Sequence, residues 1–256
     1  MIDAMMLAGK RKLAIGQVAF TSEGNYSWTV PDGVYSVSVV AVGSGGYSSL
    51  SGHTHFNNEL IAYSTTGAAG GTTAGADGGG PGGDGGSGDT RYVSGGNAQA
   101  GGGGGGAGGY TSSGDAGGNA SAGTTAGNKA NGGGGGGVGL HGGDPSSGQG
   151  PGAEGGDRGY HTLDGLCGLG RSGGAPDTQT RTTNPGLFGG GRGGFNSQNG
   201  RGAGGLGYKN NIPVTPGQTL PIKVRGNGAV RVIWPGNERY FPTTRTADEF
   251  EEQEPV

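Results

Sequence analysis

The feature that most constrains this chain is its glycine-rich middle, from Gly67 to Gly207. It holds two uninterrupted runs, Gly101–Gly106 and Gly132–Gly137, and most of the 70 glycines among the 256 residues. Large apolar side chains are too sparse there to form a conventional core. Two interpretations remain: either the stretch is disordered, or glycine itself is the packing unit, because backbones without a Cβ can approach one another closely.

Part of this region has a period of three. Pro81–Gly88 consists of X-Gly-Gly triplets, and Gly189–Phe195 repeats the pattern with Arg192 at the X position. Three residues per turn is the period of polyproline II, so such a helix presents two edges for backbone contact and one edge of side chains. Asp84, Ser87 and Arg192 are therefore expected to face solvent. The six-glycine runs have no side chain on any edge and suit helices that are surrounded on all sides.

Disorder is the alternative, because ordering costs about 1–2 kcal/mol of backbone freedom per residue and most for glycine. Flexible linkers, however, are normally Gly/Ser-rich with few aromatic residues. Here, segments such as 47–65, 119–131, 160–172 and 176–184 separate the glycine runs, and two of them contain aromatic residues. The sequence favours an ordered stack, with these segments as loops between short straight runs.

Two β segments bracket the glycine region. Alternating apolar residues in 17–42 predict two or three strands, and those in 220–224 and 229–234 predict a hairpin. The brackets contain both tryptophans, Trp28 and Trp234, and the densest apolar alternation of the chain. They are predicted to pair with each other, so that the glycine region is a closed excursion from one small sheet.

The predicted fold is mainly β and irregular, with almost no α-helix: a small antiparallel β framework of N- and C-terminal strands that closes a polyglycine II helix sandwich. The predicted parts are an N-terminal attachment segment (1–16), the first part of the framework (17–46), the polyglycine II sandwich with recognition loops (47–212), the closing hairpin (213–235) and a partly disordered C-terminal tail (236–256). Its structural residues are Trp28, Trp234, Gly101, Gly102, Gly103, Gly104, Gly105, Gly106, Gly132, Gly133, Gly134, Gly135, Gly136 and Gly137.

Composition and charge argue against several classes of protein. The net charge of −3 provides no basic face for nucleic acid. Cys167 is the only cysteine, which rules out an intramolecular disulfide and a thiolate metal site. No stretch approaches the ~18 apolar residues of a membrane span, and the basic group 10–12 follows the apolar part of the N-terminus, the wrong order for a secretory signal. We therefore expect no membrane insertion, and we expect the protein to be made in a cytoplasm.

The motifs that resemble catalytic sites have no supporting context. Residues 170–174 match the Gly-x-Ser-x-Gly nucleophile elbow, but neither the strand before it nor the helix after it is predicted. Gly-x-Gly-x-x-Gly occurs repeatedly because the region is glycine-rich, and the Gly-Lys-Ser/Thr of a phosphate-binding loop is missing. Neither an enzyme nor a cofactor is predicted.

Histidine and aromatic residues between the glycine runs are the candidates for binding. His53 and His55 are two apart, a spacing that suits zinc or iron on an extended segment, but surface loop histidines are the favoured interpretation and no metal is assigned. Rigid rings on loop tips favour recognition at low entropy cost, or else they clamp the ends of the stack. The candidate receptor-binding residues are Tyr47, His53, His55, Phe56, Tyr63, Tyr92, Tyr110, Tyr160, His161, Phe188 and Phe195.

Both brackets resemble a known family. Segments 28–34, 37–46, 216–220 and 228–234 are similar to the glycine-rich domain of bacteriophage tail and tail-fibre proteins, and 240–244 is similar to the C-termini of myovirus tail proteins. The resemblance implies packed polyglycine helices. It also implies a virion tail protein that is assembled in the host cytoplasm.

The nearest functional analogue is the adhesin at the tip of T-even-type tail fibres, whose loops bind outer-membrane proteins or polysaccharide. The implied partners are other tail or fibre proteins and a bacterial surface receptor. The His-x-His element of residues 53–55 is similar to those of some trimeric phage fibres, so a homotrimer is one assembly that the resemblance implies. A purely structural tail subunit, whose glycine slab binds neighbouring virion proteins, is the alternative, and a flat ice-binding slab is a third class.

Overall fold

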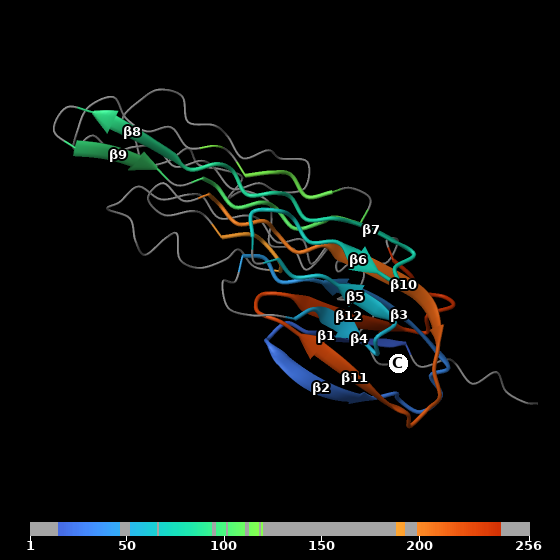
Figure 1. Cartoon of the computed structure of the whole chain (residues 1–256). Coiled ribbons are helices and arrows are strands. Elements are labelled where there is room, and N and C mark those ends of the chain that lie inside the picture. The colour runs from blue at the N-terminus through green and yellow to red at the C-terminus, as the bar shows by residue number, and fades with distance from the viewer. Residues whose placement is uncertain are drawn as a thin grey trace, which may run out of the picture.

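The computed structural model describes residues 15–46, 52–65, 67–93, 96–100, 102–110, 113–117, 119, 188–192 and 199–241. Within these ranges every regular element is a β-strand and every strand pairing is antiparallel, so the predicted mainly β class is confirmed. A β-sandwich forms one end of the molecule, and extended glycine segments run from it to the other end (Figure 1).

Sheet A contains the two strands, β7 and β10, that adjoin the glycine segments 81–88 and 199–205. Its five strands follow the order β1 (Gly16–Phe20), β12 (Ala229–Trp234), β3 (Ser36–Val42), β10 (Leu206–Pro213) and β7 (Gly78–Gly80). The N-terminal and C-terminal brackets alternate within it, since β12 lies between β1 and β3. The predicted pairing of the two brackets is thus confirmed.

Sheet B faces sheet A and also combines residues from distant parts of the chain. Its order is β2 (Gly24–Thr29), β11 (Thr219–Val224), β4 (Thr54–Phe56), β5 (Leu60–Ala62) and β6 (Thr73–Ala74). The first two strands come from the brackets, and the other three come from residues 54–74, before the glycine triplets of 81–88. The β framework is therefore larger than the brackets alone.

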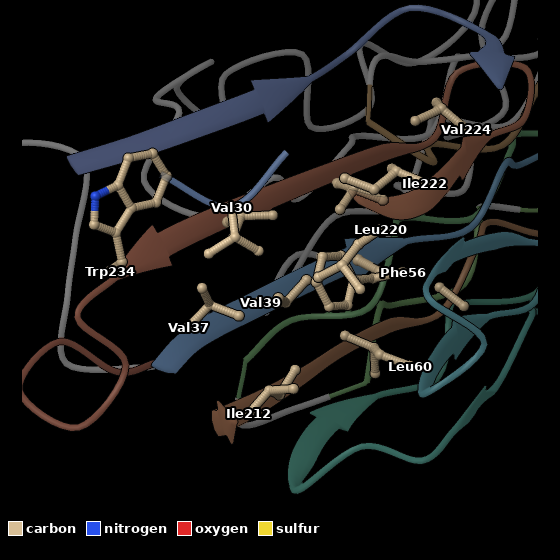
Figure 2. Close-up of a cluster of buried hydrophobic side chains, with 14 of the residues drawn as sticks. Val30, Val37, Val39, Phe56, Leu60, Ile212, Leu220, Ile222, Val224 and Trp234 are labelled. Atoms are coloured by element: carbon tan, nitrogen blue, oxygen red, sulfur yellow. The ribbon is translucent and has the colours of Figure 1, made fainter. Parts of the chain in front are cut away.

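The hydrophobic core lies between the two sheets, where alternate residues of each strand meet (Figure 2). Sheet A contributes buried valines such as Val37 and Val39, and sheet B contributes Phe56, Leu60 and Ile222. The period-two alternation of the brackets produces this face, because successive side chains of a strand point to opposite sides. The remaining buried members of the cluster are Val30, Val34, Ala41, Ala62, Ile212, Leu220, Val224, Val230, Val232 and Trp234.

Strand β3 is buried on both faces. Its odd-numbered valines enter the core, whereas Val40 and Val42 belong to a second cluster with Leu206, Ile233 and Phe241. The near-continuous apolar sequence of this strand is typical of a strand covered on both sides. The second cluster also contains Ala107, Ala203 and Ala229, and it is where the glycine segments meet the sandwich.

A bulge in β10 moves this strand from one cluster to the other. Leu206 and Tyr208 pack in or against the second cluster, but Ile212 lies in the core between the sheets. The register shifts between Lys209 and Ile212, and Asn211 has a positive φ of 50°. One extra residue in the strand turns each later side chain to the opposite side of the sheet. In this way one strand contributes to both clusters.

The predicted hairpin of 220–224 and 229–234 is wrong. The turn itself is present, since the Gly228 amide donates to the Arg225 carbonyl at 2.8 Å. The two strands it joins nevertheless enter different sheets, β11 in sheet B and β12 in sheet A. The alternation of apolar residues is the same whether two strands pair in one sheet or face each other from two sheets. Here the apolar faces of β11 and β12 point toward each other across the core.

The prediction that 47–65 is a loop is also wrong for its described part. It contains β4 and β5, which form a short hairpin with His55 opposite Ile61 and Phe56 opposite Leu60. Asn57 and Asn58 make its turn, with positive φ values of 46° and 55°, a conformation that asparagine tolerates better than most residues. The hairpin buries Phe56 and Leu60 completely.

Candidate functional site

Six extended segments outside the sandwich pack into one unit, called here the glycine layer. They carry few side chains and are connected by backbone hydrogen bonds. The segments are 67–71, 81–88, 102–109, 113–117, 188–192 and 199–205.

Backbone hydrogen bonds in segment 81–88 recur at every third residue. One set of amides donates to segment 67–71, and the set one residue further along donates to segment 102–109. The bonds, amide to carbonyl, are Gly82 to Gly71 (2.8 Å), Gly85 to Ala68 (2.7 Å), Gly83 to Gly106 (2.8 Å) and Gly86 to Gly103 (2.8 Å). The X residues Asp84 and Ser87 are exposed, as predicted. A β-strand has a period of two, so this segment has a different geometry.

Segment 102–109 is the centre of the glycine layer, and all its residues are buried. Besides segment 81–88, it shares backbone hydrogen bonds with 113–117, 188–192 and 199–205. These bonds, amide to carbonyl, are Gly105 to Arg201 (3.0 Å), Gly108 to Gly204 (3.1 Å), Gly106 to Asp115 (2.9 Å) and Gly191 to Gly105 (2.8 Å). A segment with neighbours on four sides buries backbone rather than side chains, and its polar groups find partners in those neighbours.

The glycine layer has no room for a Cβ at its contacts. A Cβ at these glycines would strike a backbone carbonyl of an adjacent segment: Gly102 that of Gly86, Gly104 that of Gly191, Gly105 that of Gly83, Gly83 that of Asp115, and Gly200 that of Gly103. At Gly33 and Gly217, in exposed turns of the sandwich, a Cβ would meet nothing within 4 Å, and glycine accommodates a φ of 78° instead. In the layer, close backbone approach is what requires glycine.

Exposed side chains bind amides at the surface of the layer. In each case a carboxylate or carboxamide oxygen accepts a hydrogen bond from a backbone amide of an adjacent segment. The contacts are Asp84 Oδ1 with the Gly70 amide (2.8 Å), Asn119 Oδ1 with the Ser87 amide (2.9 Å) and Asn199 Oδ1 with the Gly88 amide (2.9 Å). The X residue Asp84 thus contributes a hydrogen bond as well as solubility. Arg192, which was also expected to face solvent, is half-buried instead.

Asn227 connects the glycine layer to the sandwich. Its Oδ1 accepts hydrogen bonds from Ser44 Oγ (2.8 Å) and from the Gly45 amide (3.0 Å). Its Nδ2 donates to the Gly190 carbonyl at 3.0 Å, and its own carbonyl accepts from the Gly189 amide at 2.8 Å. One side chain in the β11–β12 turn therefore ties the end of β3 to segment 188–192. In the sequence Asn227 stands only in the connection between the two strands of the predicted hairpin, and its role at the junction was not predicted.

Aromatic rings also pack at this junction. The Tyr110 ring stacks on Phe241 with centroids 5.7 Å apart and lies 6.1 Å from Tyr208. Phe188 packs against the same second cluster and has a positive φ of 45°. The side chains of Tyr110 and Phe188 are half-buried between layer and sandwich, which favours the clamp interpretation for these two residues over recognition.

Two buried arginines, not singled out from the sequence, stabilise the sandwich near this junction. Arg231 donates to Gln17 Oε1 through Nη2 at 2.6 Å and lies over the Phe241 ring, 5.8 Å from its centroid. Arg239 donates through Nη1 to the carbonyls of Gly16 (2.7 Å) and Trp234 (3.3 Å). Both ends of the described chain are therefore held together at the sandwich.

The chain reverses at the far end of the glycine layer. Segment 81–88 continues from β7 and runs away from the sandwich, and segment 102–109 returns antiparallel to it. Between them, β8 (Asp89–Val93) and β9 (Gly96–Ala100) form a separate two-stranded hairpin at the end opposite to the sandwich (Figure 1). Tyr92 belongs to β8, opposite Asn97. This distal hairpin is the part of the described chain most remote from the sandwich.

The candidate receptor-binding residues do not come together in one place. The prediction that Phe56 binds a receptor is wrong. This ring is fully buried in the core between the sheets, because β4 pairs with β11, and no ligand can reach it there. His53, His55 and Tyr63 lie on or beside the β4–β5 hairpin, far from Tyr92. The candidates Tyr47, Tyr160, His161, Phe195 and the structural residues Gly101 and Gly132–Gly137 lie outside the described residues.

The two histidines differ in environment. His53 is exposed and meets Tyr63 edge-on, with ring centroids 4.4 Å apart. Burial lowers the pKa of His55 below its ordinary value, with further contributions from Lys223, His53 and Arg225. Among the described residues, no group of three or more His, Cys, Asp or Glu side chains is arranged to hold a metal ion.

Comparisons of the chain with protein-family models, with curated proteins and with solved structures find no match in any of the three. In the part of the chain that the structure describes, no helix is long and apolar enough to cross a membrane.

Proposed function

We propose that the glycine layer is a polyglycine II stack and that it serves as a rigid spacer in a bacteriophage tail protein. Hydrogen bonds at every third residue support the stack, because polyproline II geometry has three residues per turn. The closeness of the backbones supports it too, since only glycine lacks the atoms that would collide. Rigidity follows from the network, in which the central segment is bonded to four others.

The protein acts as a non-enzymatic adhesin at the tail, and it binds a receptor on the bacterial surface with the distal part of the layer. The single observation that carries this proposal is the polarity of the molecule. The described ends of the chain are held at the sandwich by Arg239, and the β8–β9 hairpin lies at the opposite end. A sandwich that attaches to other tail proteins and a spacer that presents loops away from them is the arrangement an adhesin needs.

A competition experiment tests this function. Purified protein, added to host cells before the phage that encodes it, should reduce phage adsorption in proportion to its concentration. A variant in which residues 91–92 and 97–98 of the hairpin are exchanged for Ser-Gly pairs should fold, as judged by its melting temperature, and compete less well. Undiminished adsorption at saturating protein would exclude the adhesin role.

The same experiment distinguishes the structural alternative. A tail subunit that only joins neighbouring proteins should not compete for host cells. It should instead be required for assembly of the particle, so virions should be absent when the gene is disrupted. An adhesin should leave assembly intact and remove adsorption. Electron microscopy of particles from the disrupted phage, together with an adsorption assay, separates the two.

A further inference from the structure

A group of basic side chains lies at β4 and β11 on the outer side of sheet B and is called here the basic face: His53, His55, Lys223 and Arg225. His55 of β4 and Lys223 of β11 are directly opposite each other in the antiparallel register. The preceding pair in that register, Phe56 and Ile222, points into the core. Because successive residues of a strand face opposite sides, His55 and Lys223 point away from the core and lie side by side on the outer face.

The other two members lie just beyond the ends of the same strands. Arg225 directly follows β11, and its Nη1 lies 3.6 Å from Glu23; His53 directly precedes β4 and meets the Tyr63 ring. His55 experiences the charges of Lys223, His53 and Arg225. Four nitrogen-bearing side chains, two on neighbouring strands and two just beyond the ends of those strands, thus form one cluster next to the Tyr63 ring.

The acids near the basic face do not balance it. Glu23, just before β2, lies 3.6 Å from Arg225 Nη1. Glu59, in the β4–β5 turn, is already paired with Lys209 at 3.7 Å. With both imidazoles neutral the cluster therefore has one more positive charge than negative, and protonation of His53 and His55 adds two, although the chain as a whole has a net charge of −3.

Two nitrogens of this cluster lack a partner. His55 Nδ1 and Arg225 Nε are both buried and have no hydrogen-bond partner among the described residues. Buried polar groups in folded proteins are usually bonded, so Arg225 Nε lacks an acceptor and His55 Nδ1 lacks a hydrogen-bond partner among the described residues. Lys223 and Arg225 are only half-buried, so small side-chain movements would open the cluster to a ligand.

We propose that the basic face is a binding site for a phosphate group. Arginine offers paired donors to phosphate oxygens, lysine adds a compact positive charge, and protonated histidine donates through both ring nitrogens. The phosphate can belong to the free inorganic ion or to a phosphorylated saccharide; the chemistry recognised is the same. This site is at the sandwich end of the molecule and does not depend on the adhesin proposal.

Histidine ring signals of the full chain in proton NMR provide the test. The pH titration of His55, assigned with His55→Gln, is recorded in inorganic phosphate and in chloride of equal ionic strength. Bound phosphate should raise the His55 pKa, and by linkage it should bind more tightly at about pH 6 than at about pH 8. Lys223→Gln and Arg225→Gln should each weaken binding roughly tenfold.

The matched control is Arg201→Gln, which removes a positive charge in the glycine layer, outside the cluster, and should leave phosphate binding unchanged. Glucose 6-phosphate, with glucose as its control, identifies the molecule that carries the phosphate group. Tighter binding of glucose 6-phosphate than of inorganic phosphate indicates a phosphorylated saccharide. Equal or weaker binding indicates the free ion. The proposal is overturned if phosphate and chloride shift the His55 titration equally, or if both cluster variants bind as the wild type does while their amide spectra remain folded.

Discussion

Gly104 and Gly191 lie so close that a Cβ built on Gly104 would be 2.5 Å from the carbonyl carbon of Gly191. Real Cβ atoms essentially never come within 3.0 Å of another heavy atom in this way. The two residues come from segments far apart in the sequence, and the Gly191 amide also donates to the neighbouring Gly105 carbonyl at 2.8 Å. Glycine is thus the core residue of this half of the molecule.

The first prediction concerns that contact. Gly104→Val should reduce the free energy of unfolding by more than about 4 kcal/mol or prevent folding, because its branched side chain must push two backbones apart. Ser87→Val, at an exposed X position, should change it by about 0.5 kcal/mol. Urea unfolding measures both. Equal losses in the two variants would contradict the packed glycine layer.

The second prediction concerns order in the layer. The amides of Gly83 and Gly86, which donate to segment 102–109, should exchange with solvent slowly, and the amide of the exposed Gly33 should exchange fast. Hydrogen exchange followed by NMR measures this at single residues. Fast exchange at Gly83 and Gly86, together with rapid proteolysis of the segment, would mean that the glycine segments are disordered in solution.

The third prediction concerns Phe56, which sequence reasoning assigned to receptor binding. Phe56→Ala should destabilise the protein by about 3–5 kcal/mol, because it leaves a cavity between the sheets. Tyr35→Ala is the control, since 66% of Tyr35 is exposed, and it should have little effect on the midpoint of urea unfolding. A stable Phe56→Ala protein would argue against the burial of this ring.

The fourth prediction concerns Asn227, which joins the layer to the sandwich. Asn227→Ala removes the acceptor of the Ser44 and Gly45 hydrogen bonds and the donor to Gly190. It should cost about 1–3 kcal/mol, the usual penalty for partly buried groups left unsatisfied. Asn25→Ala, on an exposed side chain of β2, is the matched control. Faster exchange of the Gly189 amide in Asn227→Ala alone would locate the effect at the junction.

The fifth prediction concerns pH. The folded pKa of His55 is lowered, whereas in the unfolded chain it should be near the ordinary value of about 6.5. The unfolded state therefore binds more protons between these two values, so this residue lowers stability as the pH falls below about 6.5, with no further loss below the folded pKa. His55→Gln should show a smaller decrease of the urea midpoint between about pH 7.5 and 5.5. An identical decrease would exclude this contribution.

Local periodicity predicted part of the structure correctly. Alternation over 17–42, 220–224 and 229–234 placed strands where β1, β2, β3, β11 and β12 occur, because side-chain facing in a strand depends only on neighbours along the chain. The triplets of 81–88 predicted that Asp84 and Ser87 would be exposed. For the candidate site the same approach failed at Phe56, because the short β4–β5 hairpin resembles a loop until β11 pairs with it.

By itself the sequence determined the mainly β class and the strands of the two brackets, and it predicted that a region with so few side chains, if ordered, packs through its backbone. Only the tertiary structure decided which strands share a sheet, so that β11 and β12 separate after one turn, and which segments surround 102–109. The physical reason is the same in both cases. Backbone amides and carbonyls are alike at every residue, and a glycine carries no side chain that could specify its partner, so those contacts are set by the assembled fold.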